Sequence, residues 1–295
     1  MGLSTAQIAQ FERDGFLLVP DLLTAADLAP VIAEYAAYID RRAQELYAAG
    51  RLTQTYAAEP FERRLACISQ ETGELYPELD IMYLRGPATF AFLHNEKLLD
   101  VAESLIGPEL LCSPIQHLRP KLPSGLTPRG SDPHVVHWHQ DAGVTWEEAD
   151  PYFILTMWLP LVDATPENGC LRVIPGLHKG GLLPHRTKRG LGTAIHGDLL
   201  AHHPIVTLPM RKGSVLLMHK HTPHSSSRNT TDTVRWSMDL RYQATGTATG
   251  RPFQPAFVVR SQADASTVLG DHATWAAQWV AALAQSQGTR VHRWP

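Results

Sequence analysis

The segment 234–242 alternates without interruption between apolar and polar side chains. Successive side chains of a β-strand point to opposite faces, so this alternation places a polar row on one face. The polar row comprises Arg235, Ser237, Asp239 and Arg241. The opposite row comprises Val234, Trp236, Met238 and Leu240. A charged row within a region rich in strands predicts a β-barrel with a polar interior.

Apolar segments that suit the other strands of such a barrel begin at about residue 109. The run Tyr152–Leu161 lacks polar alternation, which indicates a strand buried on both faces. Further strands are predicted at Phe16–Val19, Leu110–His117, Cys170–Ile174, Ile205–Leu208 and Ser214–Met218. Helical periodicity predicts helices at 5–13, at 24–49, at 95–106 and at 273–284.

The fold class expected from this pattern is mainly β with flanking helices. We predict one domain over residues 1–295, because no linker or internal repeat divides the chain. It has a helical N-terminal part at about 1–108, a barrel at about 109–243 and a C-terminal helical extension at about 244–295. Trp275 and Trp279 lie on one face of the last helix, where either the core or a homodimer interface would bury them.

Composition narrows the classes of partner and compartment. The 295 residues carry a formal net charge of -3 and no long basic run, so nucleic acid is not an expected partner. The three cysteines are far apart in the sequence, which fits a reducing cytoplasm. The N-terminal segment lacks the apolar core of a signal peptide, and no apolar run is long enough for a transmembrane helix. We therefore expect a cytoplasmic protein.

The stretch from His137 to Asp141 contains a candidate metal motif. His139 and Asp141 are two residues apart, so on an extended strand an imidazole and a carboxylate point to the same side. A third ligand from elsewhere would complete two histidines and one carboxylate on one face of a metal, as in non-haem Fe(II) oxygenases. A distant segment supplies three candidates, His219, His221 and His224.

His224 has a context that the other two candidates lack. Ser226, Asn229 and Arg235 follow it by two, five and eleven residues. This arrangement resembles the distal motif of the phytanoyl-CoA dioxygenase-like proteins, a family of Fe(II)- and 2-oxoglutarate-dependent oxygenases. The segments Trp138–Asp141, Glu167–Gly180 and 11–23 also resemble the family's motifs, in the family's order. The resemblance covers roughly residues 11–243.

This resemblance implies a double-stranded β-helix, a jelly-roll or cupin-like barrel, and a set of site residues. His139, Asp141 and His224 would bind Fe(II) as the catalytic centre. Arg235 would bind the distal carboxylate of 2-oxoglutarate as a bidentate partner, assisted by Ser226. Trp158 and Lys121 would line the cosubstrate pocket. With O2 as the second cosubstrate, the expected reaction is hydroxylation or a related oxidation of an unactivated C–H bond in a small-molecule substrate, with release of succinate and CO2.

Two other functions compete with this interpretation. One is a metal-binding cupin-like barrel without oxygenase activity, which has no need for the cation at Arg235. The other is a zinc hydrolase, which is disfavoured because no H-E-x-x-H motif is present. The family itself leaves the substrate and the regiochemistry open.

We expect the remaining polar residues to have structural or supporting roles. His137 is expected to face substrate or support a ligand, or to be a metal ligand itself in a register one step earlier. His219 and His221 are expected to be structural or surface residues. Arg241 and Asp239 are expected to pair with each other inside the barrel. The basic, glycine-rich segment 177–203 shows no periodicity and reads as a long loop, which is either a mobile lid or a solvated loop.

Overall fold

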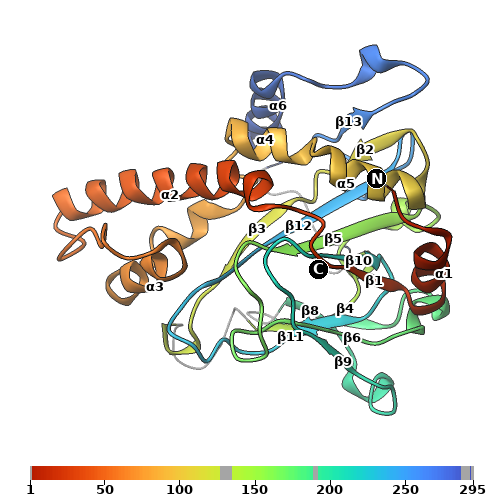
Figure 1. The fold of residues 1–295 in the computed structure, drawn as a ribbon, viewed down its shortest axis with the longest axis horizontal. Helices are drawn as coiled ribbons and strands as arrows, with labels where there is room; N and C mark the ends of the chain where they lie inside the picture. The colour runs from red at the N-terminus through yellow and green to blue at the C-terminus, as the bar shows by residue number, and fades with distance from the viewer. Residues whose placement is uncertain (1, 127–134, 189–191, 287–292, 294–295) are drawn as a thin grey trace.

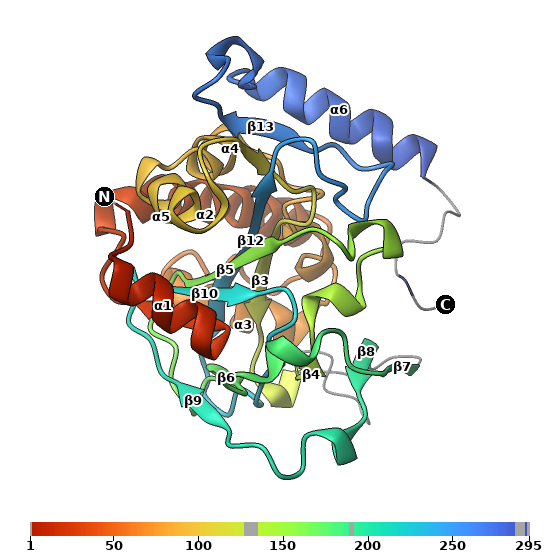
Figure 2. The same ribbon diagram turned by 90° about the vertical axis from the view of Figure 1, so that its right-hand side faces the viewer.

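Two β-sheets face each other, and helices cover the outer side of the larger one (Figures 1 and 2). The computed structural model describes residues 2–126, 135–188, 192–286 and 293. None of the helices in these ranges combines the length and apolar character needed to span a bilayer. Helices hold more of the described residues than strands do, yet the facing sheets form the barrel that the alternating segment predicted.

The larger sheet is antiparallel throughout and has the strand order β1-β10-β5-β12-β2-β13, with β3 also paired to β12. Its strands are β1 (Phe16–Val19), β2 (Leu110–Cys112), β3 (His117–Lys121), β5 (Ile154–Pro160), β10 (Val215–His219), β12 (Arg235–Ala244) and β13 (Phe257–Arg260). The predicted strand Leu110–His117 is thus two strands, because the chain turns at residues 113–116 and both halves pair with β12.

The smaller sheet has the order β4-β11-β6-β9 and is also antiparallel. Its strands are β4 (Val136–His139), β6 (Leu171–Val173), β9 (Val206–Leu208) and β11 (His224–Ser226). Two antiparallel sheets that enclose a polar interior confirm the expected double-stranded β-helix.

Six α-helices and several short 3-10 helices connect and cover these strands within the described residues. The α-helices are α1 (Thr5–Asp14), α2 (Ala25–Ala48), α3 (Phe61–Glu71), α4 (Pro87–Leu93), α5 (Glu96–Ile106) and α6 (His272–Gln285). The 3-10 helices are η1 (Tyr76–Leu79), η2 (Ser124–Leu126), η3 (Asp141–Gly143), η4 (Glu147–Ala149), η5 (Leu177–Gly180), η6 (Gly197–Leu199) and η7 (Ala265–Thr267). Local capping explains where two of them begin: Thr24 and Asp27 form a capping box at α2, and Asn95 caps α5.

The two faces of β12 separate the apolar core from the polar interior. Trp236, Met238 and Leu240 are fully buried in the core that the helices share with the larger sheet. Trp236 stacks on Phe61 of α3, with ring centroids 4.6 Å apart. Arg235, on the opposite face, lines a cavity between the sheets together with Asp239 and Arg241. The alternation seen in the sequence therefore matches the division between core and cavity.

The segment 177–203 is not the structureless loop that its lack of periodicity suggested. It contains an antiparallel hairpin of β7 (His185–Lys188) and β8 (Gly192–Ile195), and β8 lies beside β4. Each strand has only four residues, and neither His-Arg-Thr-Lys nor Gly-Thr-Ala-Ile alternates between apolar and polar residues. Thr193 of β8 lines the central cavity. Residues 189–191 of this segment, Arg189 among them, lie outside the described residues, and whether the segment acts as a lid stays a hypothesis.

Three further histidines gather between η5 and the end of β10. The ring of His219 lies 5.3 Å from that of His178 and 5.1 Å from that of His221, measured between centroids. Burial, and next the neighbouring His221, lowers the pKa of His219 to about 3. Burial and then Lys220 lower the pKa of His221 to about 4. The cluster packs against Phe153, which agrees with the structural role predicted for His219 and His221.

The buried face of α6 gives a test of core packing. Trp275 is 1% exposed and packs against Phe90 with ring centroids 5.3 Å apart, whereas Val280 on the same helix is 60% exposed. Trp275→Ala should lower the free energy of unfolding by about 3–5 kcal/mol, because it removes a large buried ring. Val280→Ala should change it by less than about 0.5 kcal/mol. Urea denaturation measures both, and similar losses would contradict core burial of Trp275.

The histidine cluster predicts a loss of stability in acid. A histidine whose folded-state pKa lies below its unfolded value of about 6.5 makes the unfolded chain bind more protons, so stability is complete above about pH 6.5 and falls towards about pH 4. In His219→Asn, the fall in unfolding free energy over this pH range should be smaller than in the wild type. Urea titrations of the metal-free proteins test this, with exposed His202→Asn as the control. Parallel pH profiles for wild type and His219→Asn would refute the assignment.

Candidate metal and cosubstrate site

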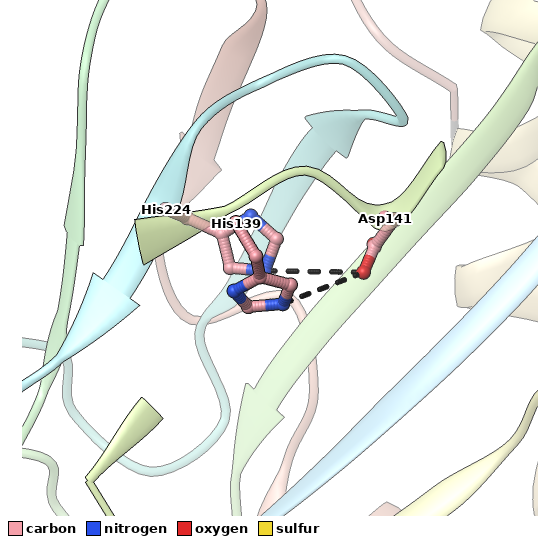
Figure 3. A group of neighbouring side chains, drawn as sticks. All are labelled: His139, Asp141 and His224. Carbon is pink, nitrogen blue, oxygen red and sulfur yellow. Dashed lines mark ion pairs between the residues drawn. The ribbon is translucent and has the colours of Figure 1, made fainter. Parts of the chain in front are cut away.

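His139, Asp141 and His224 converge at one end of the cavity (Figure 3). His139 ends β4 and His224 begins β11, and the two are direct partners across these strands. Asp141 follows β4 in η3. One ligand atom from each residue lies within 4.8 Å of the others, and Asp141 Oδ1 is 3.9 Å from Nε2 of each histidine. Strand pairing thus brings the distant histidine of the sequence to the H-x-D motif.

Backbone carbonyls orient both imidazoles towards the centre. Nδ1 of His139 lies 2.9 Å from the His137 carbonyl oxygen, and Nδ1 of His224 lies 3.0 Å from that of Thr222. A carbonyl oxygen only accepts, so each Nδ1 carries a hydrogen, and Nε2 is the ring nitrogen that faces the centre. Burial, and next the neighbouring His224, lowers the pKa of His139 to about 3, so this imidazole is neutral at neutral pH.

Asp141 is buried and accepts hydrogen bonds on both oxygens. Arg241 Nη2 donates to Oδ1 at 2.8 Å, and the Thr156 hydroxyl donates to Oδ2. Burial alone would raise the pKa of Asp141, but the Arg241 guanidinium and the two histidines together hold it well below its usual range. The carboxylate is therefore charged and fixed in orientation.

The predicted pairing of Arg241 with Asp239 is wrong. Arg241 pairs with Asp141, and Asp239 accepts a hydrogen bond from Arg119 Nε at 2.7 Å. Arg241 and Asp239 do share a face of β12, as the alternation predicted. Each nevertheless has a closer partner on another element, which a pattern confined to one strand does not reveal.

Arg235, Ser226 and Trp158 also line the cavity. The Arg235 guanidinium carbon lies 5.1 Å from the centroid of the Trp158 ring, within cation–π range. Among the described residues, Arg235 Nη1 donates to the Ser237 hydroxyl at 3.1 Å, and Arg235 Nε is buried with no partner. Burial lowers the pKa of Arg235 to about 10, although Asp239 opposes the change. A buried cation with an unused donor suits an incoming carboxylate.

Lys121 is buried next to Ser226, which lines the cavity. Its Nζ donates to the Ser226 hydroxyl at 2.8 Å and to the Ser227 carbonyl oxygen. Lys121 and Arg235 are direct partners in the β3–β12 register. Lys121 thus contacts the predicted cosubstrate site through Ser226.

The other residues singled out in the sequence take supporting positions. His137 is exposed and lines the cavity, where its backbone carbonyl orients His139. Asn229 donates to the Lys121 and Thr233 carbonyls and so holds the turn before β12.

Neither the contact of Thr156 with Asp141 nor that of Arg241 with Asp141 was predicted from the sequence. A signal for Thr156 existed, since it is the one hydroxyl residue in the buried segment 154–160.

The residues present fit an iron ion and a keto-acid cosubstrate. Two imidazoles and one carboxylate on a single side leave coordination positions open, as in the facial triad of non-haem Fe(II) oxygenases. The cavity has a volume of about 320 Å³ and reaches from this triad to Arg235. Its apolar walls include Ile115, Val136, Val144, Leu171 and Met218.

Comparison with known proteins places the chain in a family. The sequence model of the phytanoyl-CoA dioxygenase (PhyH) family matches residues 11–237. The ectoine dioxygenase of Sphingopyxis alaskensis is 27% identical over 282 residues, which cover 88% of this chain and 83% of that protein. The phytanoyl-CoA dioxygenase domain-containing protein 1 of Rattus norvegicus is 25% identical over 307 residues, which cover 87% of this chain and 99% of that protein.

Solved structures share the fold. The nickel complex of the non-heme monooxygenase ThoJ has a TM-score of 0.61 at 20% identity, covering 96% of this chain and 97% of that one. The epimerase SnoN, in complex with Fe3+ and alpha ketoglutarate, has a TM-score of 0.54 at 23% identity, covering 84% and 87%. The family match spans most of the chain and includes all three residues of the triad, His139, Asp141 and His224. This protein therefore belongs to the phytanoyl-CoA dioxygenase family of Fe(II)- and 2-oxoglutarate-dependent oxygenases.

Proposed function

We propose that this protein hydroxylates an unactivated C–H bond of a small molecule at an iron centre held by His139, Asp141 and His224. The observation that carries the proposal is the convergence of these three ligand atoms in the same cavity as the buried Arg235. A metal-binding barrel without oxygenase activity would need the triad alone. The cavity instead joins the triad to a cation suited to a dicarboxylate.

The roles of the cosubstrate residues follow from their surroundings. Arg235 would bind the distal carboxylate of 2-oxoglutarate through its unused Nε and its guanidinium edge. Ser226 would donate to the same carboxylate while it accepts from Lys121. Trp158 holds the guanidinium plane by its ring contact. Binding of the dianion would compensate the cost of burying Arg235.

When bound, iron would provide the chemistry that uses dioxygen, in which oxidative decarboxylation of 2-oxoglutarate is coupled to oxidation of the substrate. The chain's own contribution is positioning. Nδ1–H of His139 and of His224 is held by a carbonyl, so both Nε2 atoms point to one centre. The apolar walls limit access of water around it.

The size of the cavity supports a small substrate. Its volume of about 320 Å³ is near the lower end of the roughly 300–1,000 Å³ of ligand pockets, and 2-oxoglutarate must share it. Relatives include an ectoine dioxygenase and, over 81 residues at 41% identity, a methylphosphonate hydroxylase of Gimesia maris. Both names denote compact polar substrates, and we propose a substrate of similar size. Homodimer formation and a cytoplasmic location stay predictions.

Anaerobic spectroscopy tests the iron and cosubstrate roles together. Addition of Fe(II) and then 2-oxoglutarate should produce visible charge-transfer absorption that needs both. Asp141→Ala should abolish it, because one of the three metal ligands is lost. Asp239→Ala removes another cavity carboxylate that is not a ligand and should retain it. Iron binding without absorption would favour the metal-binding barrel, and absorption in Asp141→Ala would contradict the ligand assignment.

Arg235 should determine cosubstrate affinity without affecting the metal. Arg235→Gln should weaken 2-oxoglutarate binding roughly 10- to 100-fold, since hydrogen bonds to a charged group are lost. Arg235→Lys should recover only part of this, because an ammonium lacks the planar fork. Titration of the charge-transfer absorption with 2-oxoglutarate gives the dissociation constants. Arg119→Gln removes a cavity-lining guanidinium paired elsewhere and should bind normally. Equal affinity in Arg235→Gln and the wild type would reject the assignment.

A further inference from the structure

One oxygen atom of Asp141 faces two different positive groups. Oδ1 is the oxygen 3.9 Å from Nε2 of both His139 and His224, so it is the oxygen that would meet the metal. The same Oδ1 accepts the 2.8 Å hydrogen bond from Arg241 Nη2. Arg241 therefore contacts the ligand atom itself, and the outer oxygen Oδ2 is left to Thr156.

The turn between β2 and β3 holds both the backbone and the guanidinium of Arg241. Its backbone N–H donates to the Gln116 side-chain oxygen at 3.1 Å, and its backbone carbonyl accepts from Gln116 Nε2 at 2.9 Å. At the far end, Nη1 donates to the Ile115 carbonyl oxygen at 3.1 Å. Gln116 is 2% exposed and Arg241 is 6% exposed. The guanidinium is thus held before any metal arrives.

Thr156 completes the support of Asp141 from the neighbouring strand. Thr156 on β5 and Arg241 on β12 are direct partners in the antiparallel register. Each donates to a different oxygen of the one carboxylate, which fixes the plane of the carboxylate as well as its direction. Only a hydroxyl residue of the same length could replace the Thr156 donor, and a lysine in place of Arg241 would lack the planar, two-pronged guanidinium.

We infer that Arg241 is a positioning residue for the metal ligand: it holds Asp141 Oδ1 towards the two imidazoles and withdraws electron density from that oxygen. This inference rests on the proposed iron site. Partners of this kind around a metal ligand typically change metal affinity or activity by about 10- to 100-fold. The positive charge beside the ligand also makes the bound iron poorer in electrons, which raises the energy of charge transfer from iron to 2-oxoglutarate.

Metal affinity and the charge-transfer energy give two readouts that do not depend on turnover. Titration with Mn(II), followed by the electron paramagnetic resonance of the free ion, should show about 10- to 100-fold weaker binding in Arg241→Met than in the wild type. Arg241→Lys should also bind weakly, because an ammonium does not bridge Ile115 and Asp141 as the guanidinium does. With Fe(II) and 2-oxoglutarate under anaerobic conditions, the absorption of Arg241→Met should shift to longer wavelength.

Arg119→Met is the matched control for charge. It removes a guanidinium from the same cavity wall, but one whose partner is Asp239 instead of a residue of the triad. Its Mn(II) affinity and absorption should equal those of the wild type. A loss in Arg119→Met as large as that in Arg241→Met would overturn the inference, since general cavity charge would then explain both.

A second variant covers the case in which Arg241→Met does not fold, as judged by circular dichroism. Thr156→Val keeps the shape of the side chain and removes the donor to Oδ2, so it should weaken Mn(II) binding by the same mechanism. Wild-type affinity in both Arg241→Lys and Thr156→Val would refute positioning by these donors. Failure of the wild type to bind Mn(II), or unchanged binding in Asp141→Ala, would instead reject the proposed iron site.

Discussion

The buried carboxylate of Asp141 is the interaction on which the site depends. It is charged although buried, because Arg241 and Thr156 each donate to one of its oxygens. Without these partners, burial would favour the protonated form, which is a poor metal ligand. The two sheets must therefore close correctly before the triad exists, since Arg241 and Thr156 belong to the larger sheet and both histidines to the smaller.

Strand β12 connects this requirement to the rest of the fold. One face carries Trp236, Met238 and Leu240 into the core beneath the helices, and the other carries Arg235 and Arg241 into the cavity. A shift of one residue in its pairing would exchange these faces, placing guanidinium groups in an apolar core. The large apolar burial along one face thus stabilises the register that the catalytic side chains on the other face need.

The candidate site was predictable from sequence to the extent that its residues lie in short motifs. His139 and Asp141 are two residues apart, and His224 precedes Arg235 by eleven, so spacing and resemblance were enough to select them. Lys121 was predicted to line the cosubstrate pocket, and the structure adds that its Nζ contacts the cavity-lining Ser226 hydroxyl, a partner that spacing does not reveal. The hairpin β7–β8 was predicted to be a loop, since its four-residue strands show no alternation of apolar and polar residues.

The sequence by itself predicted the barrel and four of the six α-helices of the described residues, because periodicity is a local property that one chain segment displays. Spacing together with the family resemblance selected the three expected metal ligands. Only the tertiary structure decided the partners of those ligands. Arg241 pairs with Asp141, a hundred residues away, and not with Asp239 on its own strand. The reason is physical: a buried charge pairs with the nearest opposite charge in space, and that neighbour is set by sheet closure and register.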